Sequence, residues 1–334
     1  PLRDGVPDLS FISDAAALVG PRIRPGACVV LESTTYPGTT EEVLAPLLEA
    51  GSGLTAGRDF SLGYSPERID PGNRTWTFAK TPKVVSGIDE ASLARVEAFY
   101  GGLVERTVPV GGTREAELTK LLENTFRHVN IALVNELARY AAELGISVWE
   151  AIDAASTKPF GYLRFTPGPG VGGHCLPVDP TYLSWKVQRS LGSSFRFVEL
   201  ANAINDDMPA YVVQRLEAGL ARRQRVLQGA HLLLVGLAFK ADTADLREAP
   251  ALHIARRLSA FGAAVHAADP HVLDPLPDAP LVRVELTPEE VERADAVVLV
   301  TDHSTFDLTI IERHAAYAFD TRHRLRAGPN VEYL

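Results

Sequence analysis

The stretch of the chain that most suggests chemistry is "PGPGVGGHCLPVDP", residues 167–180. It holds Cys175, one of only 2 cysteines, four residues before Asp179. Three interpretations of Cys175 stay open on spacing alone: a small buried apolar side chain, a metal ligand, or a nucleophile that needs oxyanion-stabilising groups beside it. Metal binding is the weakest, because the adjacent His174 and Cys175 rarely converge on one ion, so no metal site is expected.

Residues 168–173 of this stretch formally match the pattern G-x-G-x-x-G. We do not interpret them as a dinucleotide-binding turn, because no strand is expected before them and Pro177 and Pro180 oppose the helix that should follow. We expect Gly172 and its neighbours to let the backbone approach a ligand closely or to adopt positive φ.

Partners for a nucleophilic thiol are found on a long helical pattern, residues 113–145, which is free of proline and of glycine until its last residue. Lys120 and Asn124 are spaced i, i+4 and so share one helix face, where an ammonium and an amide can stabilise an oxyanion. The alternative is a solvated lysine and an incidental asparagine. The other cysteine, Cys28, lies in an apolar strand pattern and is interpreted as structural.

Two loops after predicted strands add polar groups. "ESTTYPG" places Thr34 and Thr35 at the carboxyl end of a strand, which is where α/β sheets bind ligands. "YSPERIDPGNR" places Glu67 in a similar position, inside a turn bounded by prolines. Each of these signals is weak by itself.

The elements that must position these residues follow an α/β order. Short apolar runs alternate with helical patterns up to residue 110, which predicts parallel strands. Two long helical patterns follow, and Pro209 is expected to kink the second. "HLLLVGLAFK" (231–240) opens a second α/β unit. We therefore expect two Rossmann-like parallel-sheet domains, 1–110 and 226–334, joined by a helical middle domain, 111–225.

Composition limits the class of protein. The 334 residues are 46% hydrophobic and carry a net charge of −9, so nucleic acid and an anionic membrane surface are not expected as partners. No apolar run is long enough to span a bilayer. Two cysteines are too few for a disulfide framework, which favours a reducing cytoplasm.

Six segments together resemble the nucleotide-sugar 6-dehydrogenases, the family of UDP-glucose, UDP-N-acetylhexosamine and GDP-mannose dehydrogenases. They are "ESTTYPGTT", "YSPERIDPGN", "ELTKLLENTFRHVNIALVNELA", "GPGVGGHCLPVDPTYL", "ANAIND" and "GLAFKADTADLRE". The form "GGHCLPVDP" is most similar to the branch that oxidises UDP-N-acetylglucosamine or UDP-N-acetylmannosamine. The resemblance implies a four-electron oxidation at C6 of the sugar with NAD, through a thiohemiacetal and a thioester on the cysteine.

The same resemblance implies a role for each matching residue. Cys175 is the nucleophile, Lys120 and Asn124 stabilise the oxyanion, Asp179 works with a water near the reacting oxygen, Glu67 is the general base for hydrolysis, and Thr35 orients the water. Thr34, Thr35 and Arg247 match cofactor contacts, and Gly172, Phe239, Lys240 and Arg322 match contacts to the UDP-sugar. A homodimer through the long helix is expected. One basic substrate contact from the neighbouring subunit, Lys158 or Arg164, stays unassigned.

The chain departs from the family at its start. Family members open with a strand and a G-x-G-x-x-G turn that holds the NAD pyrophosphate, and residues 1–34 contain no such motif. We therefore expect the chain to begin inside the N-terminal domain, as a fragment or a natural truncation, with an exposed sheet edge. The alternatives are a nucleotide-sugar-binding or oligomer-forming remnant without hydride transfer, a UDP-glucose 6-dehydrogenase, and a two-electron hydroxy-acid dehydrogenase.

Overall fold

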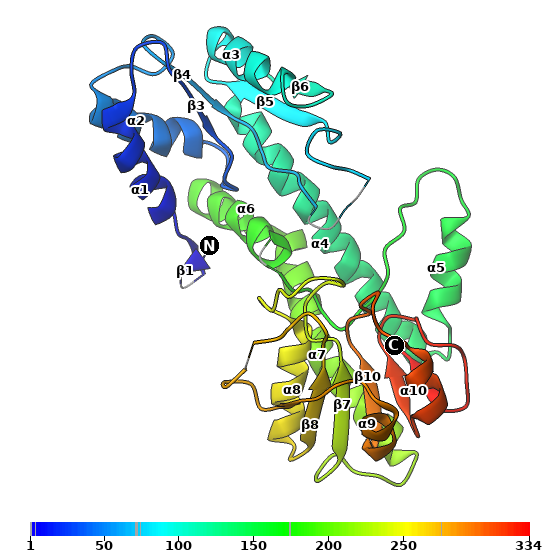
Figure 1. Ribbon diagram of the computed structural model, residues 1–334. Helices are drawn as coiled ribbons and strands as arrows, with labels where there is room; N and C mark the ends of the chain where they lie inside the picture. Colours follow the sequence, from blue (N-terminus) through cyan, green and yellow to red (C-terminus); the bar gives the residue numbers. More distant parts are fainter. Residues whose placement is uncertain (1, 4, 71–72, 74, 174, 275) are drawn as a thin grey trace. The chain divides into compact units, whose positions relative to one another are not determined.

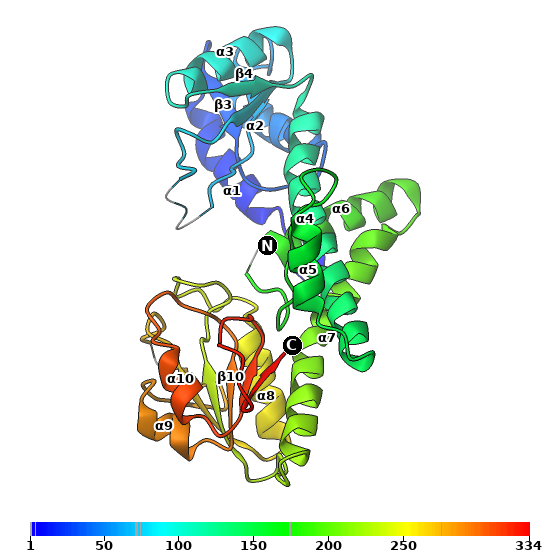
Figure 2. The ribbon, with the colours of Figure 1, turned by 90° about the vertical axis from the view of Figure 1, so that its right-hand side faces the viewer.

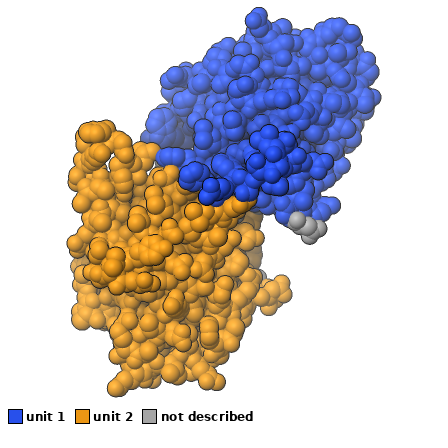
Figure 3. All heavy atoms as spheres, turned by 180° about the vertical axis from the view of Figure 1, so that it is seen from behind, with its two compact units in different colours: residues 1–127, 178–198 blue, residues 128–177, 199–334 orange. Residues whose placement is uncertain are grey.

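The computed structural model describes residues 2–3, 5–70, 73, 75–173, 175–274 and 276–334, apart from the side chains of Cys175 and Pro177. These residues form two compact units (Figure 3). Unit 1 comprises residues 1–127 and 178–198, and unit 2 comprises residues 128–177 and 199–334. The expected α/β fold class is confirmed, since each unit contains a sheet covered by helices.

Unit 1 is built on a four-stranded sheet in the order β3-β4-β5-β6 (Figure 1). Its elements are the hairpin β1 (Leu2–Arg3) and β2 (Val6–Pro7), α1 (Ser10–Val19), β3 (Cys28–Leu31), α2 (Ala45–Ser52), β4 (Ser61–Tyr64), β5 (Lys83–Gly87), α3 (Glu90–Gly101) and β6 (Thr107–Pro109). A 3-10 turn, Gly20–Arg22, follows α1, and a π-helical turn, Thr40–Leu44, leads into α2. Ile12, Ala16 and Leu48 from α1 and α2 pack on Phe60 and Leu62 to form the core.

The sheet of unit 1 is mixed, where all-parallel strands were expected. Strands β3 and β4 are parallel and so are β5 and β6, but β4 and β5 run antiparallel. No helix lies between β4 and β5 in the described residues of segment 65–82, and a parallel pair needs a crossover connection, usually a helix. Cys28, expected to be structural, is exposed at the start of β3, which is an edge strand of this sheet.

Helix α4 (Thr113–Glu143) fulfils the expectation of a long helix and passes from unit 1 into unit 2. It is followed by α5 (Val148–Ser156), α6 (Cys175–Leu191) and α7 (Arg196–Ala221). The expectation that Pro177 and Pro180 prevent a helix was wrong. The first turn of a helix has no intrahelical bond for a proline to remove, and α6 also accommodates Pro180 in its interior.

Unit 2 contains a six-stranded, wholly parallel sheet in the order β12-β11-β10-β7-β8-β9. Its remaining elements are β7 (His231–Val235), α8 (Pro250–Ala260), β8 (Ala264–Ala268), β9 (Val282–Arg283), α9 (Pro288–Arg293), β10 (Ala296–Leu299), α10 (Thr309–His314), β11 (Ala318–Asp320) and β12 (Val331–Tyr333). Figure 2 shows α7 and α8 on one face of the sheet and α9 and α10 on the other.

Alternating residues of β7 explain why helices cover both faces of this sheet. Leu232 and Leu234 face the core shared with α7 and α8, whereas Leu233 and Val235 face the core shared with α9 and α10. A strand buried on both faces consists of consecutive apolar residues, because the side chains on both of its faces lie in a core. This is why the sequence "HLLLV" predicts a strand. Among the described residues, no helix is both long and apolar enough to cross a membrane.

Candidate active site

In unit 1, the structure brings Asn124 of α4 together with Asp179 of α6. Asn124 Nδ2 donates a hydrogen bond to Asp179 Oδ2, and Arg127 Nη2 donates to Asn124 Oδ1. Asn124 is 1% and Asp179 4% exposed. Burial raises the pKa of Asp179 to about 6, although the hydrogen bond from Asn124 and the charges of Lys120 and Arg127 oppose the rise. Asp179 can therefore exchange a proton near neutral pH.

Lys120 lies one turn before Asn124 and contacts the loop after β4. Its Nζ donates a hydrogen bond to the backbone carbonyl of Glu67. The Glu67 carboxylate accepts hydrogen bonds from the backbone amides of Arg68 and Ile69, at 2.6 and 2.7 Å. Two of the residues predicted from separate segments, Lys120 and Glu67, therefore lie side by side.

A buried lysine that was not singled out from the sequence lies next to Glu67. Lys83, the first residue of β5, is 3% exposed, and its Nζ lies 2.8 Å from Glu32 Oε1 and 3.5 Å from Glu67 Oε2. Tyr100 also donates to Glu32 Oε1, at 2.7 Å. Burial acts to raise the pKa of Glu32, but the hydrogen bonds from Lys83 and Tyr100 outweigh it and the pKa is lowered. The feature of the sequence that could have identified Lys83 is its position as a charged residue at the start of the apolar run "KVVSG".

The loop that follows β3 is held by helix α4. Buried Glu117 accepts hydrogen bonds from the backbone amides of Gly38 and Thr40, at 2.5 and 2.9 Å, and from the Thr40 hydroxyl at 2.7 Å. Thr35 is fully buried, and its hydroxyl donates to Thr39 Oγ1 at 2.6 Å. Thr34 is half-buried. Among the described residues, no hydrogen bond joins Thr34 or Thr35 to Glu67.

In unit 2, the glycine-rich segment packs directly on the loop after β7. A Cβ on Gly172 would lie 2.6 Å from Phe239 Cβ and 2.7 Å from the Glu248 carbonyl oxygen. Gly173 has a φ of +83°, and its amide donates to the Arg247 carbonyl at 2.8 Å. The expected positive φ is thus present, and the close approach within the described residues is to Phe239 and its loop.

The three cations predicted for unit 2 differ in their surroundings. Arg322 lies next to Gly168, with Nη1 3.0 Å from the position of a Cβ there, and its Nε donates to the Val300 carbonyl at 2.7 Å. Burial lowers the pKa of Arg322. Arg247 is exposed and bonded to Asp245 on the same loop, with its Nε 3.0 Å from Asp245 Oδ1. Lys240 is also exposed on this loop.

Asp269, at the carboxyl end of β8, anchors the loop and was not singled out from the sequence. It accepts hydrogen bonds from the amides of Leu237 and Ala238, at 2.6 and 3.0 Å, and from His303 Nε2 at 2.9 Å. Burial would raise its pKa, but the bonds from His303 and these amides lower it. The feature of the sequence that could have identified Asp269 is its position, since it is an acidic residue directly after a buried strand.

Cys175 is the first residue of α6, one helical turn before Asp179. Its side chain, like the whole of His174, lies outside the described residues. The environment of the predicted nucleophile therefore stays a prediction.

Comparison with known proteins places these features in a family. Three family models match in succession: the NAD binding domain (residues 1–104), the central domain (114–207) and the UDP binding domain (233–327) of the UDP-glucose/GDP-mannose dehydrogenase family. The chain is also 37% identical over 306 residues to UDP-N-acetyl-D-mannosamine dehydrogenase of Pyrococcus horikoshii, covering 92% of this chain and 70% of that protein.

The chain belongs to the UDP-glucose/GDP-mannose dehydrogenase family.

Two other relatives align over a smaller share of their own length. Protein CapL of Staphylococcus aureus is 42% identical over 77% of this chain and 60% of its own, and UDP-N-acetyl-D-glucosamine 6-dehydrogenase of Pseudomonas aeruginosa is 39% identical over 80% and 63%. The chain thus spans less than two thirds of these two relatives. A solved UDP-D-ManNAc dehydrogenase of Pyrococcus horikoshii superposes with a TM-score of 0.87, at 34% identity, over 100% of this chain and 78% of that one.

The domain limits given by the family models and the compact units differ. The units divide the chain at residues 127 and 128, inside α4, because this helix continues from one unit into the other. The domain boundaries expected at 110 and 225 stay predictions.

Proposed function

We propose that this chain carries most of an NAD-dependent enzyme that oxidises the C6 hydroxyl of a UDP-N-acetylhexosamine to the carboxylic acid. The observation that supports this most is the cluster of Lys120, Asn124, Asp179 and Glu67, assembled from α4, α6 and the loop after β4. Relatives named for UDP-N-acetyl-D-mannosamine and UDP-N-acetyl-D-glucosamine favour an N-acetylhexosamine over glucose. With 2 cysteines in 334 residues, we place the enzyme in a reducing cytoplasm.

NAD, when bound, supplies the hydride acceptor for each of the two oxidation steps. Thr34 and Thr35 follow the carboxyl end of β3, the position at which α/β sheets hold such ligands. Half-buried Thr34 is the proposed cofactor contact there, and fully buried Thr35 supports it through the loop. Arg247, with its guanidinium exposed on the loop after β7, is the proposed cofactor contact from unit 2.

We assign to the cluster of unit 1 the proton transfers at the sugar oxygen and the stabilisation of the negative charge that forms on it. We assign proton transfer at O6 to Asp179, whose raised pKa suits exchange near neutral pH, together with Lys120. The Cys175 thiolate adds to the C6 aldehyde, and Lys120 and Asn124 stabilise the oxyanion that forms. After the second oxidation, water attacks the thioester with Glu67 as general base. The carboxylic acid leaves and the thiol is restored.

The nucleotide half of the substrate is assigned to unit 2. Phe239 packs on Gly172 and Arg322 lies next to Gly168 of the same glycine-rich segment. Lys240, on the loop that carries Phe239, is the proposed cation beside the diphosphate. The roles of these residues rest on the family resemblance. The geometry supports them because the loop after β7 and Arg322 each contact the glycine-rich segment.

Steady-state NADH formation with UDP-N-acetylglucosamine and UDP-N-acetylmannosamine tests the proposal, with UDP-glucose as the control substrate. We expect turnover with an N-acetylated sugar and release of two NADH for each uronate. UDP-sugar binding by calorimetry without NADH formation would instead support a binding remnant. Faster turnover with UDP-glucose would support the glucose branch of the family.

Cys175→Ser tests the covalent step. Serine is a weaker nucleophile and its ester a poorer acyl donor, so we expect uronate formation to fall by at least about 100-fold. Uronate is measured by mass spectrometry beside NADH, and Cys28→Ser is the matched control. Unchanged uronate formation by Cys175→Ser would remove the thioester from the mechanism.

A second copy of the chain is the proposed protein partner. Large apolar side chains remain exposed on one side of α4: Leu118, Leu122, Phe126, Leu133, Leu137 and Tyr140. At 100° per residue they fall within an arc of about 100°, which is a continuous stripe along the helix. Such a stripe on a long helix is typical of a helix-to-helix interface.

A further inference from the structure

Unit 2 contains a cluster of metal-binding side chains that the proposed oxidation does not use. His231 begins β7, His266 lies within β8, and Glu290 belongs to α9. One donor atom from each of the three lies within 4.8 Å of the other two, and all three residues are partly buried. We propose that His231, His266 and Glu290 bind a zinc ion that ties β7, β8 and α9 together.

The sheet register places the two histidines on one face. His231 is opposite Ala264 and His266 is opposite Leu233, so the histidines are diagonal neighbours on adjacent parallel strands. Their rings are 4.2 Å apart between centroids and nearly perpendicular, at 84°. This is the face that α9 and α10 cover, so Glu290 of α9 lies next to the two histidines.

The spacing of two donors already suits a tetrahedral ion. His266 Nδ1 donates a hydrogen bond to Glu290 Oε2 at 3.3 Å. Zinc takes the place of that proton, which moves to His266 Nε2 or to solvent. Two ligands held about 2.1 Å from zinc at tetrahedral angles lie about 3.4 Å apart, so these atoms need almost no movement. His231 is partly exposed and can close the remaining distance by a small rotation of its ring.

Hydrogen bonds to groups outside the cluster orient two of the three proposed ligands, His231 and Glu290. His231 Nδ1 lies 3.1 Å from the Arg293 carbonyl oxygen, so this nitrogen carries the proton and Nε2 keeps its lone pair. A backbone carbonyl that orients a histidine through its second nitrogen is a common feature of zinc sites. Glu290 Oε1 accepts from Arg293 Nη1 at 2.9 Å, which leaves Oε2 to face the ion.

A second cluster, Asp242, His271 and His303, provides a comparison. His303 Nδ1 accepts from the Asp242 amide at 2.9 Å, and its Nε2 donates to Asp269 at the same distance. Both nitrogens of His303 are therefore committed to holding the loop after β7. This cluster lacks a third available donor, and His271 offers a matched control for a histidine substitution.

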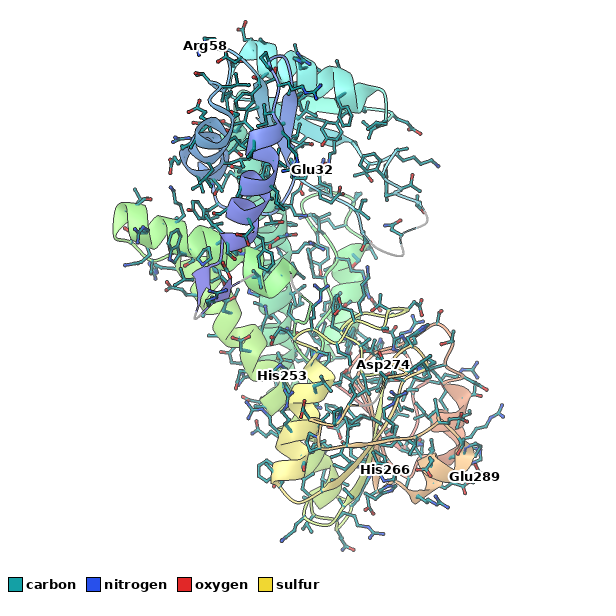
Figure 4. All side chains as sticks on the ribbon, turned by 60° about the vertical axis from the view of Figure 1, so that its left-hand side comes forward. Glu32, Arg58, His253, His266, Asp274 and Glu289 are labelled. Carbon is teal, nitrogen blue, oxygen red and sulfur yellow. The ribbon has the colours of Figure 1, made fainter. Side chains whose placement is uncertain are left out.

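The location separates the zinc cluster from the nucleotide loop. His231 is at the amino end of β7, whereas Phe239 follows its carboxyl end, where parallel sheets bind nucleotides. Figure 4 labels His266 and Glu289, the neighbour of Glu290, toward one end of this sheet, and Asp274, which follows β8, toward the other. The proposed ion therefore stabilises unit 2 and takes no part in the oxidation.

Titration of the chelator-treated full chain with Zn²⁺ by calorimetry, and with Co²⁺ by visible absorption, tests the site. We expect one ion per chain, with a Co²⁺ spectrum of nitrogen and oxygen ligands and no thiolate charge-transfer band. Loss of an outer partner costs 10- to 100-fold in affinity, so His266→Gln and Glu290→Gln, which each remove a ligand, should weaken binding by at least about 100-fold. Zn²⁺ should raise the unfolding temperature of the unsubstituted chain and leave that of His266→Gln unchanged.

His271→Gln is the control and should bind Zn²⁺ as the unsubstituted chain does. Three results would overturn the proposal: no saturable binding, a thiolate band with Co²⁺, or loss of binding in His271→Gln with binding retained in His266→Gln. Circular dichroism of each variant before titration confirms that it is folded. If His266→Gln fails that check, Glu290→Gln carries the test, since it keeps the size and shape of the glutamate side chain.

Discussion

At the scale of single residues, the buried pair of Asn124 and Asp179 decides what the proposed site can do. The amide of Asn124 donates to Asp179 and accepts from Arg127, so its orientation is fixed from both sides. Burial keeps Asp179 protonated to a higher pH than in an unfolded chain. A carboxyl group held in this way can pass a proton to or from a sugar oxygen near neutral pH.

Asp179→Asn should therefore remove a pH dependence of stability. The pKa of Asp179 rises from 3.8 to about 6 on folding, so its contribution to stability is fully present below pH 3.8 and is lost as the pH rises through 6. Two pKa units correspond to roughly 3 kcal/mol. Part of this change lies below pH 4, so urea unfolding between pH 4 and pH 7 should show the unfolding free energy of the unsubstituted chain falling by about 2 kcal/mol relative to Asp179→Asn.

The exposed Asp278→Asn is the control for this experiment and should follow the unsubstituted chain at every pH. Parallel stability curves for Asp179→Asn and the unsubstituted chain would contradict the raised pKa.

At the scale of elements, the loops that carry proposed site residues are held by residues of the neighbouring helices and strands. Glu117 of α4 fixes the loop after β3, Lys83 of β5 faces Glu32 and Glu67, and Asp269 fixes the loop after β7. Each anchor is a charged side chain buried next to a loop that carries proposed site residues. Loops positioned in this way hold their polar groups before a ligand arrives, which limits the ordering cost of binding.

Lys83→Met should destabilise unit 1 because it leaves Glu32 and Glu67 without their shared cation. Both carboxylates are partly exposed, so we expect a loss of about 1–2 kcal/mol, which is less than for a fully buried pair. Urea unfolding measures the loss. The exposed Lys80→Met should change stability little, and adding Glu32→Gln to Lys83→Met should recover part of it. Equal effects of Lys83→Met and Lys80→Met would argue against the anchor.

Gly172→Ala should disturb the contact between the glycine-rich segment and the loop after β7. Its Cβ would meet Phe239 Cβ at 2.6 Å and the Glu248 carbonyl at 2.7 Å, and neither atom can move without the backbone. We expect a loss of about 1–3 kcal/mol in unfolding free energy and weaker UDP-sugar binding by calorimetry. Gly111→Ala, whose Cβ meets nothing within 4 Å, is the control. Unchanged binding and stability in Gly172→Ala would show that the contact is loose.

At the scale of the whole molecule, helix α4 links the proposed functions. It carries Lys120 and Asn124 of the proposed catalytic cluster on one side, and an exposed apolar stripe runs along another side. One helix therefore carries residues of both the proposed site and the proposed contact between two copies of the chain.

Leu133→Asp should weaken that contact, since it places a charge in the middle of the stripe, where Leu133 is 51% exposed. Sedimentation velocity should show a dimer for the unsubstituted chain and a shift toward monomer for Leu133→Asp. Leu273→Asp, an equally drastic change at an exposed leucine outside α4, should leave the dimer intact. A monomeric unsubstituted chain would refute the dimer.

By itself, the sequence determined the α/β class, the long helix from Thr113 and the buried strand "HLLLV", because side-chain periodicity is a local property of a chain. Spacing also placed Lys120 and Asn124 on one helix face. Only the tertiary structure decided that β4 and β5 run antiparallel, that a helix forms through Pro180, and that Lys83, Glu117 and Asp269 hold the loops. These features depend on which distant segments meet in the fold, and neither a local pattern nor the spacing within one segment encodes such a meeting.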